Sequence, residues 1–138
     1  VIKLKKDMGL DQFAFKTKAK FTKEIDFESE IDQTEDGDDR VQIHYWRKHA
    51  NLQGWMESLY KEKGGSSEQF NCSPLQLTKE DLDRLAADLI DQDLPETDGF
   101  FFGQSENTEE EMQEDLAFVK DAHRAIDEGY TVYYDSWW

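Results

Sequence analysis

One short stretch of the chain carries most of the side chains that could recognise a ligand. Residues 44–49 read His-Tyr-Trp-Arg-Lys-His, so aromatic rings, a guanidinium, an ammonium and two imidazoles follow one another. Arg47 is the strongest candidate, because its planar guanidinium can bind a carboxylate or a phosphate through two hydrogen bonds, beside the rings of Trp46 and Trp55. A structural role is the alternative, since a guanidinium also stacks on aromatic rings or pairs with a nearby acid.

The three histidines, His44, His49 and His123, could form a zinc or iron site together with carboxylates. However, no two of them have the H-x-x-x-H spacing that places two imidazoles on one face of a helix. His44 and His49 also lie on either side of an expected boundary between a strand and a helix. We therefore expect histidines that are exposed or have structural hydrogen bonds, and neither a metal site nor a cofactor.

No sequence motif points to a catalytic residue. Cys72 lies in Asn-Cys-Ser-Pro, which matches no nucleophile motif and is more typical of a small half-buried residue. Pairs of acids for glycoside-type chemistry cannot be singled out among 32 acidic residues. The stretch from Asp32 begins like an EF-hand loop, but Ile43 occupies the position where a bidentate glutamate is required. These residues indicate a non-enzymatic role.

Aromatic residues later in the chain complete the candidate binding site. Three phenylalanines at 100–102 stand between glycines, and three consecutive rings cannot all face one side of a strand. At least one of these rings should therefore line a rim, a groove or an interface, although the same rings could belong to the core. The residues that we predict to bind a ligand or a partner are Tyr45, Trp46, Arg47, His49, Trp55, Phe101, Ser136 and Trp137.

Strands and helices must position these residues. Alternating apolar residues predict three strands, near 12–20, 41–46 and 130–137. Apolar residues at helical spacing predict three helices, near 50–63, 79–92 and 108–128. This set of elements indicates an α+β fold, with a mainly antiparallel sheet and about three helices packed against it.

Local signals support these elements and predict which faces are buried. In the first strand, Phe13 and Phe15 are expected on the buried face and the lysines on the solvent face. Thr78 followed by Asp81 is typical of a capping box at the start of the second helix. The third helix should begin after a cap at 107 or 108. Its expected inward stripe is Met112, Leu116, Val119, His123 and Ile126.

Length and composition indicate a single domain. The chain of 138 residues can bury a core without disulfide bonds, and its one cysteine suits a reducing compartment. No apolar run is long enough to cross a membrane and no secretory signal is recognisable, so we expect a soluble intracellular protein. Met8 resembles a natural start. We therefore expect residues 1–7 to be an upstream or added extension and residues 8–138 to be the domain, with an acidic loop near 28–40.

The net charge of −16 is unevenly distributed along the chain. Residues 1–23 carry seven lysines and two acids, whereas the remaining residues include nine basic and thirty acidic ones. Such a surface repels nucleic acid and anionic membranes, so we expect direct binding to neither. The acids could serve solubility, bind a basic protein, or imitate the DNA backbone so as to occupy a nucleic-acid-binding protein. A homodimer that buries aromatic residues is a further alternative.

Four separated motifs together resemble a known family. They are Met-Gly-Leu-Asp at 8–11, Tyr-Trp-Arg-Lys at 45–48 with Gly-Trp at 54–55, Leu-Pro at 94–95 before Gly-Phe-Phe-Phe-Gly at 99–103, and Tyr-Tyr-Asp-Ser-Trp-Trp at 133–138. In order and spacing they resemble small proteins encoded by tailed bacteriophages and prophages, over nearly the whole chain from Met8. Members are sometimes labelled phosphoglycerate kinase, but 138 residues cannot supply the two large domains of that enzyme. The resemblance therefore implies an origin rather than a reaction.

The combined expectation is a phage-encoded accessory protein in the cytoplasm of an infected bacterium. It should bind a host component, a basic protein, through its acidic surface or through the aromatic and basic residues around Arg47. Residues 80–128 contain seventeen acids and three bases. The DNA-mimic alternative requires these acids to lie on one surface at roughly the spacing of DNA phosphates. The alternative from another class is a small-ligand binder or enzyme that recognises a nucleotide or a signal molecule with Trp46, Arg47 and Trp55.

Overall fold

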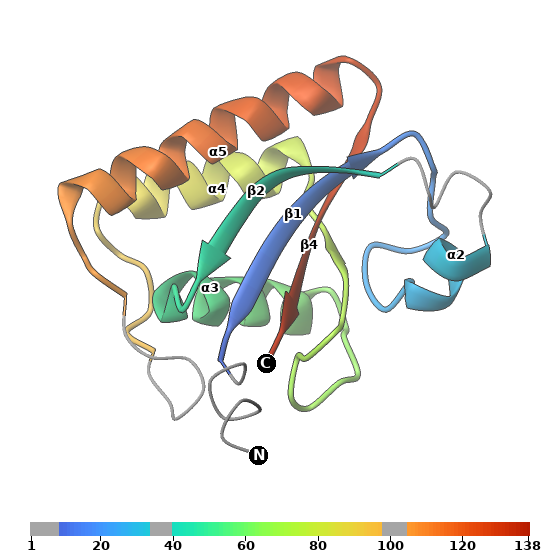
Figure 1. Cartoon of the computed structure of the whole chain (residues 1–138), viewed down its shortest axis with the longest axis horizontal. Helices are drawn as coiled ribbons and strands as arrows, with labels where there is room; N and C mark the ends of the chain where they lie inside the picture. The colour runs from blue at the N-terminus through green and yellow to red at the C-terminus, as the bar shows by residue number, and fades with distance from the viewer. Residues whose placement is uncertain (1–8, 34–39, 98–104) are drawn as a thin grey trace.

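Four antiparallel strands form one sheet in the computed structural model, which describes residues 9–33, 40–97 and 105–138. The order across the sheet is β2-β1-β4-β3 (Figure 1). The strands are β1 (Asp11–Thr17), β2 (Val41–Arg47), β3 (Leu75–Gln76) and β4 (Thr131–Trp137). Because β1 pairs with β2 on one side and with β4 on the other, the two central strands come from opposite ends of the described chain.

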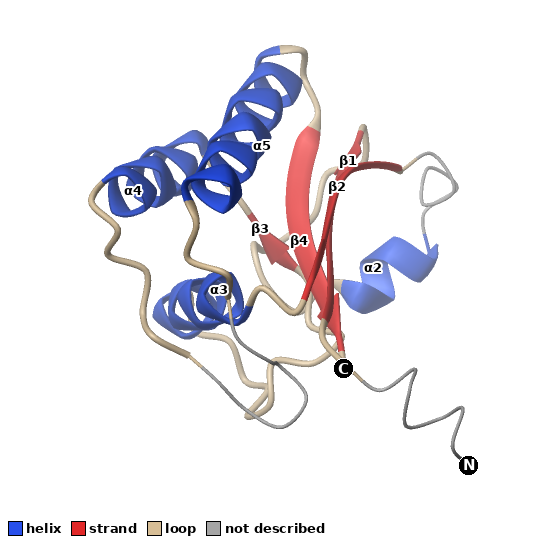
Figure 2. Cartoon of the chain, turned by 60° about the vertical axis from the view of Figure 1, so that its left-hand side comes forward, coloured by secondary structure: helices blue, strands red, loops and turns tan. Residues whose placement is uncertain are grey.

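Three helices cover one face of this sheet. The helices of the described ranges are α2 (Glu28–Gln33), α3 (Ala50–Glu62), α4 (Lys79–Ile90) and α5 (Glu109–Asp127). α3, α4 and α5 lie on the same side, with α4 and α5 next to each other, whereas α2 lies on the other side (Figure 2). The α+β fold class predicted from the sequence is confirmed. Within the described ranges, no helix is both long and apolar enough to cross a membrane.

The core lies between the sheet and these three helices. Along β4, Val132, Tyr134 and Ser136 face the helices and are almost fully buried. The ring of Trp46 on β2 meets the ring of Phe118 on α5 edge to face, with 4.8 Å between the ring centres. Burial of such apolar surface is the main favourable contribution to folding. The remaining core residues of the helices are mainly aliphatic: Leu52, Met56, Leu59, Leu82, Leu85, Leu89 and Val119.

The helices α4 and α5 begin and end close to where the local sequence signals predict. The Thr78 hydroxyl accepts a hydrogen bond from the Asp81 N–H at 3.2 Å, and the Asp81 carboxylate accepts one from the Thr78 N–H at 2.9 Å. This completes the predicted capping box of α4. Thr108 caps α5 and accepts from the Glu111 N–H at 3.1 Å. Gly129 follows α5 with a φ of 92°, in the left-handed region where glycine is favoured.

The acidic segment before β2 differs in part from the predicted loop. Residues 28–33 form the short helix α2, whose first turn contains Glu28 and Glu30. Carboxylates in a first turn suit the positive end of the helix dipole. The Glu30 carboxylate also accepts hydrogen bonds from the Thr22 backbone at 3.0 Å and from the Thr22 hydroxyl at 2.9 Å. Residues 34–39 of the predicted loop lie outside the described residues.

The prediction for the faces of β1 and the residues after it was partly wrong: Lys18 and Lys20 are exposed as expected, but the two phenylalanines are not on the buried face. Gln12 and Ala14 are fully buried on the helix side, whereas Phe13 and Phe15 lie half-exposed on the opposite face. Ala14 is opposite Tyr134 of β4, whose large buried ring leaves room only for a small neighbour. Phe15 instead contacts Tyr133 on the other face of the sheet, at 5.3 Å between ring centres.

Candidate functional site

The structure distributes the predicted binding residues over several places. At the end of β2, Arg47 Nη1 lies 2.6 Å from Asp11 Oδ1, and the Tyr45 hydroxyl donates to the same oxygen at 2.6 Å. Partial burial and this bond to Asp11 raise the pKa of Tyr45. Arg47 is therefore already paired with a local acid, which is the structural role that the sequence left open.

The two tryptophans of the predicted site are core residues. Trp46 is 6% exposed and Trp55 is 7% exposed. The Trp46 indole N–H donates to Asp115 Oδ1 at 2.9 Å, and the Trp55 indole N–H donates to Asp88 Oδ2 at 2.8 Å. Because both rings are buried and both N–H groups have partners, neither tryptophan offers an exposed surface on which a ligand could stack.

Ser136 and Trp137 lie apart from the end of β2. Ser136 is buried, and its hydroxyl accepts from Gln53 Nε2 of α3 at 3.0 Å. Trp137 lies at the end of β4 and is 64% exposed. Phe101 lies outside the described residues. Among the predicted residues that are described, His49 and Trp46 are brought together by their shared contact with Asp115.

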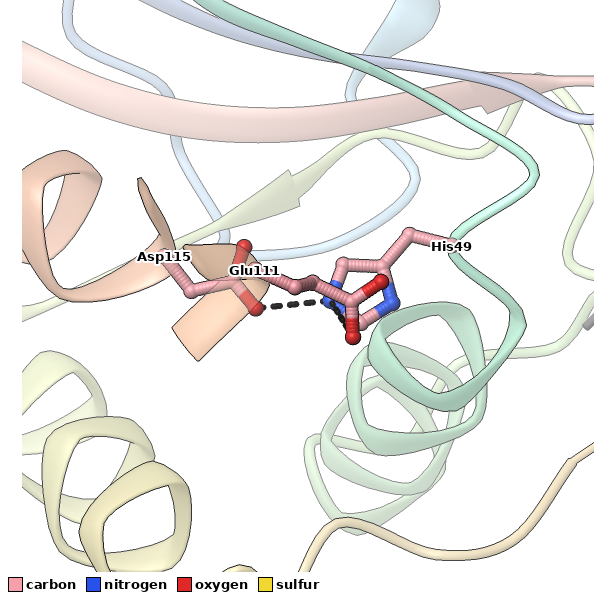
Figure 3. Close-up of side chains that lie close together, drawn as sticks. All are labelled: His49, Glu111 and Asp115. Carbon is pink, nitrogen blue, oxygen red and sulfur yellow. Dashed lines mark hydrogen bonds and ion pairs between the residues drawn. The ribbon is translucent and has the colours of Figure 1, made fainter. Parts of the chain in front are cut away.

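His49 has the densest set of buried polar contacts among the predicted residues. Its Nε2 lies 2.6 Å from Asp115 Oδ2 and 3.7 Å from Glu111 Oε1, while its Nδ1 lies 2.6 Å from Ser105 Oγ. Figure 3 shows both carboxylates approaching the same ring nitrogen from α5. We call His49, Glu111 and Asp115 the His–carboxylate cluster.

Gln12 holds the backbone of His49 in place. Its side-chain amide donates to the His49 carbonyl at 3.0 Å and accepts from the His49 N–H at 2.9 Å. The same Nε2 donates to the Tyr134 hydroxyl at 3.0 Å, so one buried side chain connects β1, β4 and the turn before α3. Lys48 adopts a left-handed φ of 58°, which turns the chain from β2 toward α3.

The two carboxylates of the cluster share one face of α5, because residues four apart in a helix lie one above the other. Asp115 is 1% exposed, and its second oxygen accepts from the Trp46 indole. Glu111 is partly exposed and accepts from the backbone N–H groups of Glu106 at 2.9 Å and Asn107 at 3.3 Å. A buried carboxylate needs such partners, since an unpaired one would be very costly.

Ser105 connects the His–carboxylate cluster to the start of α3. Its Oγ accepts from the Asn51 N–H at 2.9 Å and contacts His49 Nδ1. Ser105, His49 and Asp115 are thus arranged like the nucleophile, the base and the acid of a catalytic triad. A nucleophilic serine also needs N–H donors directed at the oxyanion, whereas the Asn51 N–H is bonded to the serine oxygen itself. The arrangement is better suited to orienting the imidazole than to attacking a substrate.

Two clefts meet at the cluster. The first, of about 400 Å³, lies between residues 45–49 and the start of α5, with Glu106, Glu110, Glu111 and Glu114 on its acidic wall. The second, of about 340 Å³, lies between the start of α3, the connection from α4 to α5, and the first turns of α5. Glu111 lines both clefts, His49 lines the first and Asp115 lines the second. Each cleft therefore borders part of the cluster, and Glu111 is its most exposed member.

A histidine and an aspartate elsewhere on the sheet have shifted pKa values. His44 packs on Trp46 with 4.3 Å between ring centres, and burial lowers the pKa of its imidazole despite the acids of α5. Asp135 on β4 lies on the face of the sheet away from α5. Burial raises the pKa of the Asp135 carboxyl to about 6.

The sequence identified His49 but not its partners. The inward stripe predicted for α5 was partly wrong, because the buried residues of this helix are Asp115, Phe118, Val119, Ala122 and Ala125. His123 is half-buried and pairs with exposed Asp83 at 2.9 Å. One signal could have identified Asp115: it precedes Phe118 and Ala122 at helical spacing, so the helix carries an acid within its apolar stripe.

Comparison with known proteins assigned no family to the chain. No protein-family model, no curated protein and no solved structure matched it. A function must therefore be inferred from the geometry and charge of the chain itself.

Proposed function

We propose that the protein is a non-enzymatic binding protein whose acidic helix layer holds a basic segment of another protein. The observation that carries this proposal is the charge of the surface formed by α4, α5 and the chain between them. Among the described residues from 80 to 128, twelve acids are exposed, against three exposed bases, Arg84, Lys120 and Arg124. α4 and α5 lie next to each other on one side of the sheet, so these acids belong to one layer (Figure 2).

Internal ion pairs involve only part of this negative charge. Within the described ranges, Asp127 pairs with Lys79, Asp83 with His123 at 2.9 Å, and Asp121 with Arg124 at 4.0 Å. The acidic wall of the first cleft has four glutamates, three of them among these twelve acids, and Arg47 and Lys48 also line this cleft. Since Arg47 is paired with Asp11, the cleft has excess negative charge and suits an inserted lysine or arginine side chain.

The resemblance to phage-encoded proteins supplies the context of the proposal. In that context the partner is a basic protein of the bacterial host, bound in the host cytoplasm. In the DNA-mimic form of the proposal, the partner is a nucleic-acid-binding protein and the acids of α4 and α5 take the place of DNA phosphates. The small-ligand alternative has less support, because Trp46 and Trp55 are buried with their N–H groups engaged.

Capture of partners from a bacterial lysate tests the proposal when charge variants are compared. The test variant is Glu110→Lys/Glu114→Lys, which reverses two charges of the cleft wall. The matched control is Glu57→Lys/Glu68→Lys, which changes the net charge equally but lies on α3 and in the loop after it. We expect wild type and control to retain one basic protein that is released by added salt, and the test variant to lose it.

Two outcomes would refute the binding proposal. One is the absence of any salt-sensitive partner above the background of an untagged control. The other is equal loss of the partner in both charge variants, because the binding would then follow net charge alone. Competition separates the two forms of the proposal: duplex DNA should displace the protein from a nucleic-acid-binding partner and leave any other basic partner bound.

A further inference from the structure

We propose that the His–carboxylate cluster binds one divalent metal ion such as Zn²⁺ or Mn²⁺. The ligand atoms of His49, Glu111 and Asp115 all lie within 4.8 Å of one another. One imidazole nitrogen with two carboxylates is a donor set that suits zinc, iron and manganese. This metal site does not depend on the proposed binding of a partner protein. The sequence predicted no metal site, because the three ligands come from distant segments of the chain rather than from a local histidine motif.

Burial and charge favour a cation at this position. His49 is 4% exposed and Asp115 is 1% exposed, while the Glu111 side chain is 16% exposed. Two carboxylates therefore converge on one ring nitrogen in a region that water reaches poorly, where like charges repel strongly. A divalent ion balances both negative charges and leaves a neutral imidazole as the third ligand.

Partners outside the cluster orient two of its ligands for metal binding. When Nε2 of His49 coordinates an ion, the proton is placed on Nδ1, which can donate to Ser105 Oγ at 2.6 Å. The Asp115 oxygen that does not face His49 accepts from the Trp46 indole at 2.9 Å. Metal-binding histidines and carboxylates are characteristically held by a second set of hydrogen bonds of this kind.

The two distances from His49 Nε2 to the carboxylate oxygens require only small adjustments. Two ligands of a tetrahedral ion with bonds of about 2.1 Å lie roughly 3.4 Å apart. The distance from His49 Nε2 to Glu111 Oε1, 3.7 Å, is already close to this value. The 2.6 Å contact between Nε2 and Asp115 Oδ2 must open by less than about 1 Å as the metal replaces the shared proton.

The clefts give the ion a route and open coordination positions. The first cleft reaches His49 and Glu111, and the second reaches Asp115 and Glu111. Three protein ligands leave at least one position of a tetrahedral ion for water or for a group of a bound partner. Sites of this type are open sites, in contrast to structural sites that are closed by four protein ligands.

Calorimetric titration of the metal-free protein with Zn²⁺ tests the proposal. The buffer contains excess Mg²⁺, which occupies scattered surface carboxylates but requires an octahedral set of oxygen ligands. We expect one Zn²⁺ per chain for the wild type. Asp115→Asn, which can keep the acceptor for the Trp46 indole, should weaken binding more than tenfold. The control His123→Gln, which removes the half-buried histidine that pairs with exposed Asp83, should leave the affinity unchanged.

A second variant keeps the test decisive if Asp115→Asn does not fold. Ser105→Ala leaves all three ligands in place and removes only the group that contacts His49 Nδ1, so it should weaken Zn²⁺ binding about tenfold to a hundredfold. Circular dichroism establishes that each variant is folded. The proposal is overturned if the wild type binds no stoichiometric Zn²⁺, or if every folded variant binds as tightly as the wild type.

Discussion

Replacement of Asp135 by asparagine should stabilise the fold in a pH-dependent way. Burial raises the pKa of this carboxyl, and Glu28 adds to the effect, while the Ser136 N–H bond at 2.9 Å and the charge of Arg40 oppose it. The native structure therefore prefers the protonated carboxyl and loses stability as the group ionises. Asn can keep the oxygen that accepts from Ser136 and cannot acquire the charge.

The size of the effect follows from the two pKa values. The carboxyl titrates near 3.8 in an ordinary environment and at about 6 in the folded protein. Between these values the folded state binds more protons than the unfolded state, so the free energy of unfolding of the wild type falls as the pH rises. We expect the free energy of unfolding of Asp135→Asn to exceed that of the wild type by about 1.5 kcal/mol near pH 5 and by about 3 kcal/mol near pH 7, with no further increase above that pH.

Urea unfolding of both proteins in steps from pH 5 to pH 8 measures this difference. The other titrating groups are common to both proteins and cancel in the comparison. Glu68→Gln, an exposed acid outside the sheet, removes the same charge and should change stability by less than about 0.5 kcal/mol at each pH. A difference between Asp135→Asn and wild type that does not vary with pH would refute the reasoning, as would a less stable variant at pH 7.

Three further substitutions test the elements around the site. Gln12→Ala removes both side-chain hydrogen bonds to the His49 backbone, so urea titration should show that the free energy of unfolding falls by about 2–4 kcal/mol. An unfolding curve equal to that of the wild type would contradict this anchoring role. Thr78→Ala should lower the free energy of unfolding by about 1 kcal/mol in the same assay, because the hydroxyl caps α4. Thr78→Ser keeps a hydroxyl and should therefore retain most of the wild-type stability. Gly65→Ala places a methyl group 2.3 Å from the Tyr60 ring, so the melting temperature should fall by several degrees; an unchanged melting temperature would mean that the ring can move aside.

Helices could be predicted closely because their signals are local. α4 has its Thr78 cap, its leucine stripe and its end within one short segment, and the structure reproduces all three. The face of β1 could not be chosen in this way. Alternation along β1 fits either side of the sheet, and the choice depends on Tyr134, which meets Ala14 only after the chain has folded.

The His–carboxylate cluster was harder to predict than the fold. His49 has a residue type that attracts attention, but Ser105 is 56 positions away and Asp115 is 66 positions away. Among 32 acids, the sequence distinguishes Asp115 only by its helical spacing from Phe118 and Ala122, whereas the structure shows that it is 1% exposed. That burial depends on how α5 is rotated over the sheet, which is set by the contact of Phe118 with Trp46 rather than by the helix itself.

The pairing of β1 with β4 also determines when the protein can fold during its synthesis. β4 is the last strand of the described chain, and its register aligns Thr131 with Thr17 at one end and Trp137 with Asp11 at the other. β1 and β2 can pair as soon as both have left the ribosome, but one edge of β1 stays open until the last strand emerges. The helix-facing core is likewise incomplete without Val132 and Tyr134. A nascent chain that stops before β4 should therefore expose an unpaired strand edge and an uncovered apolar face, both of which favour aggregation and capture by chaperones.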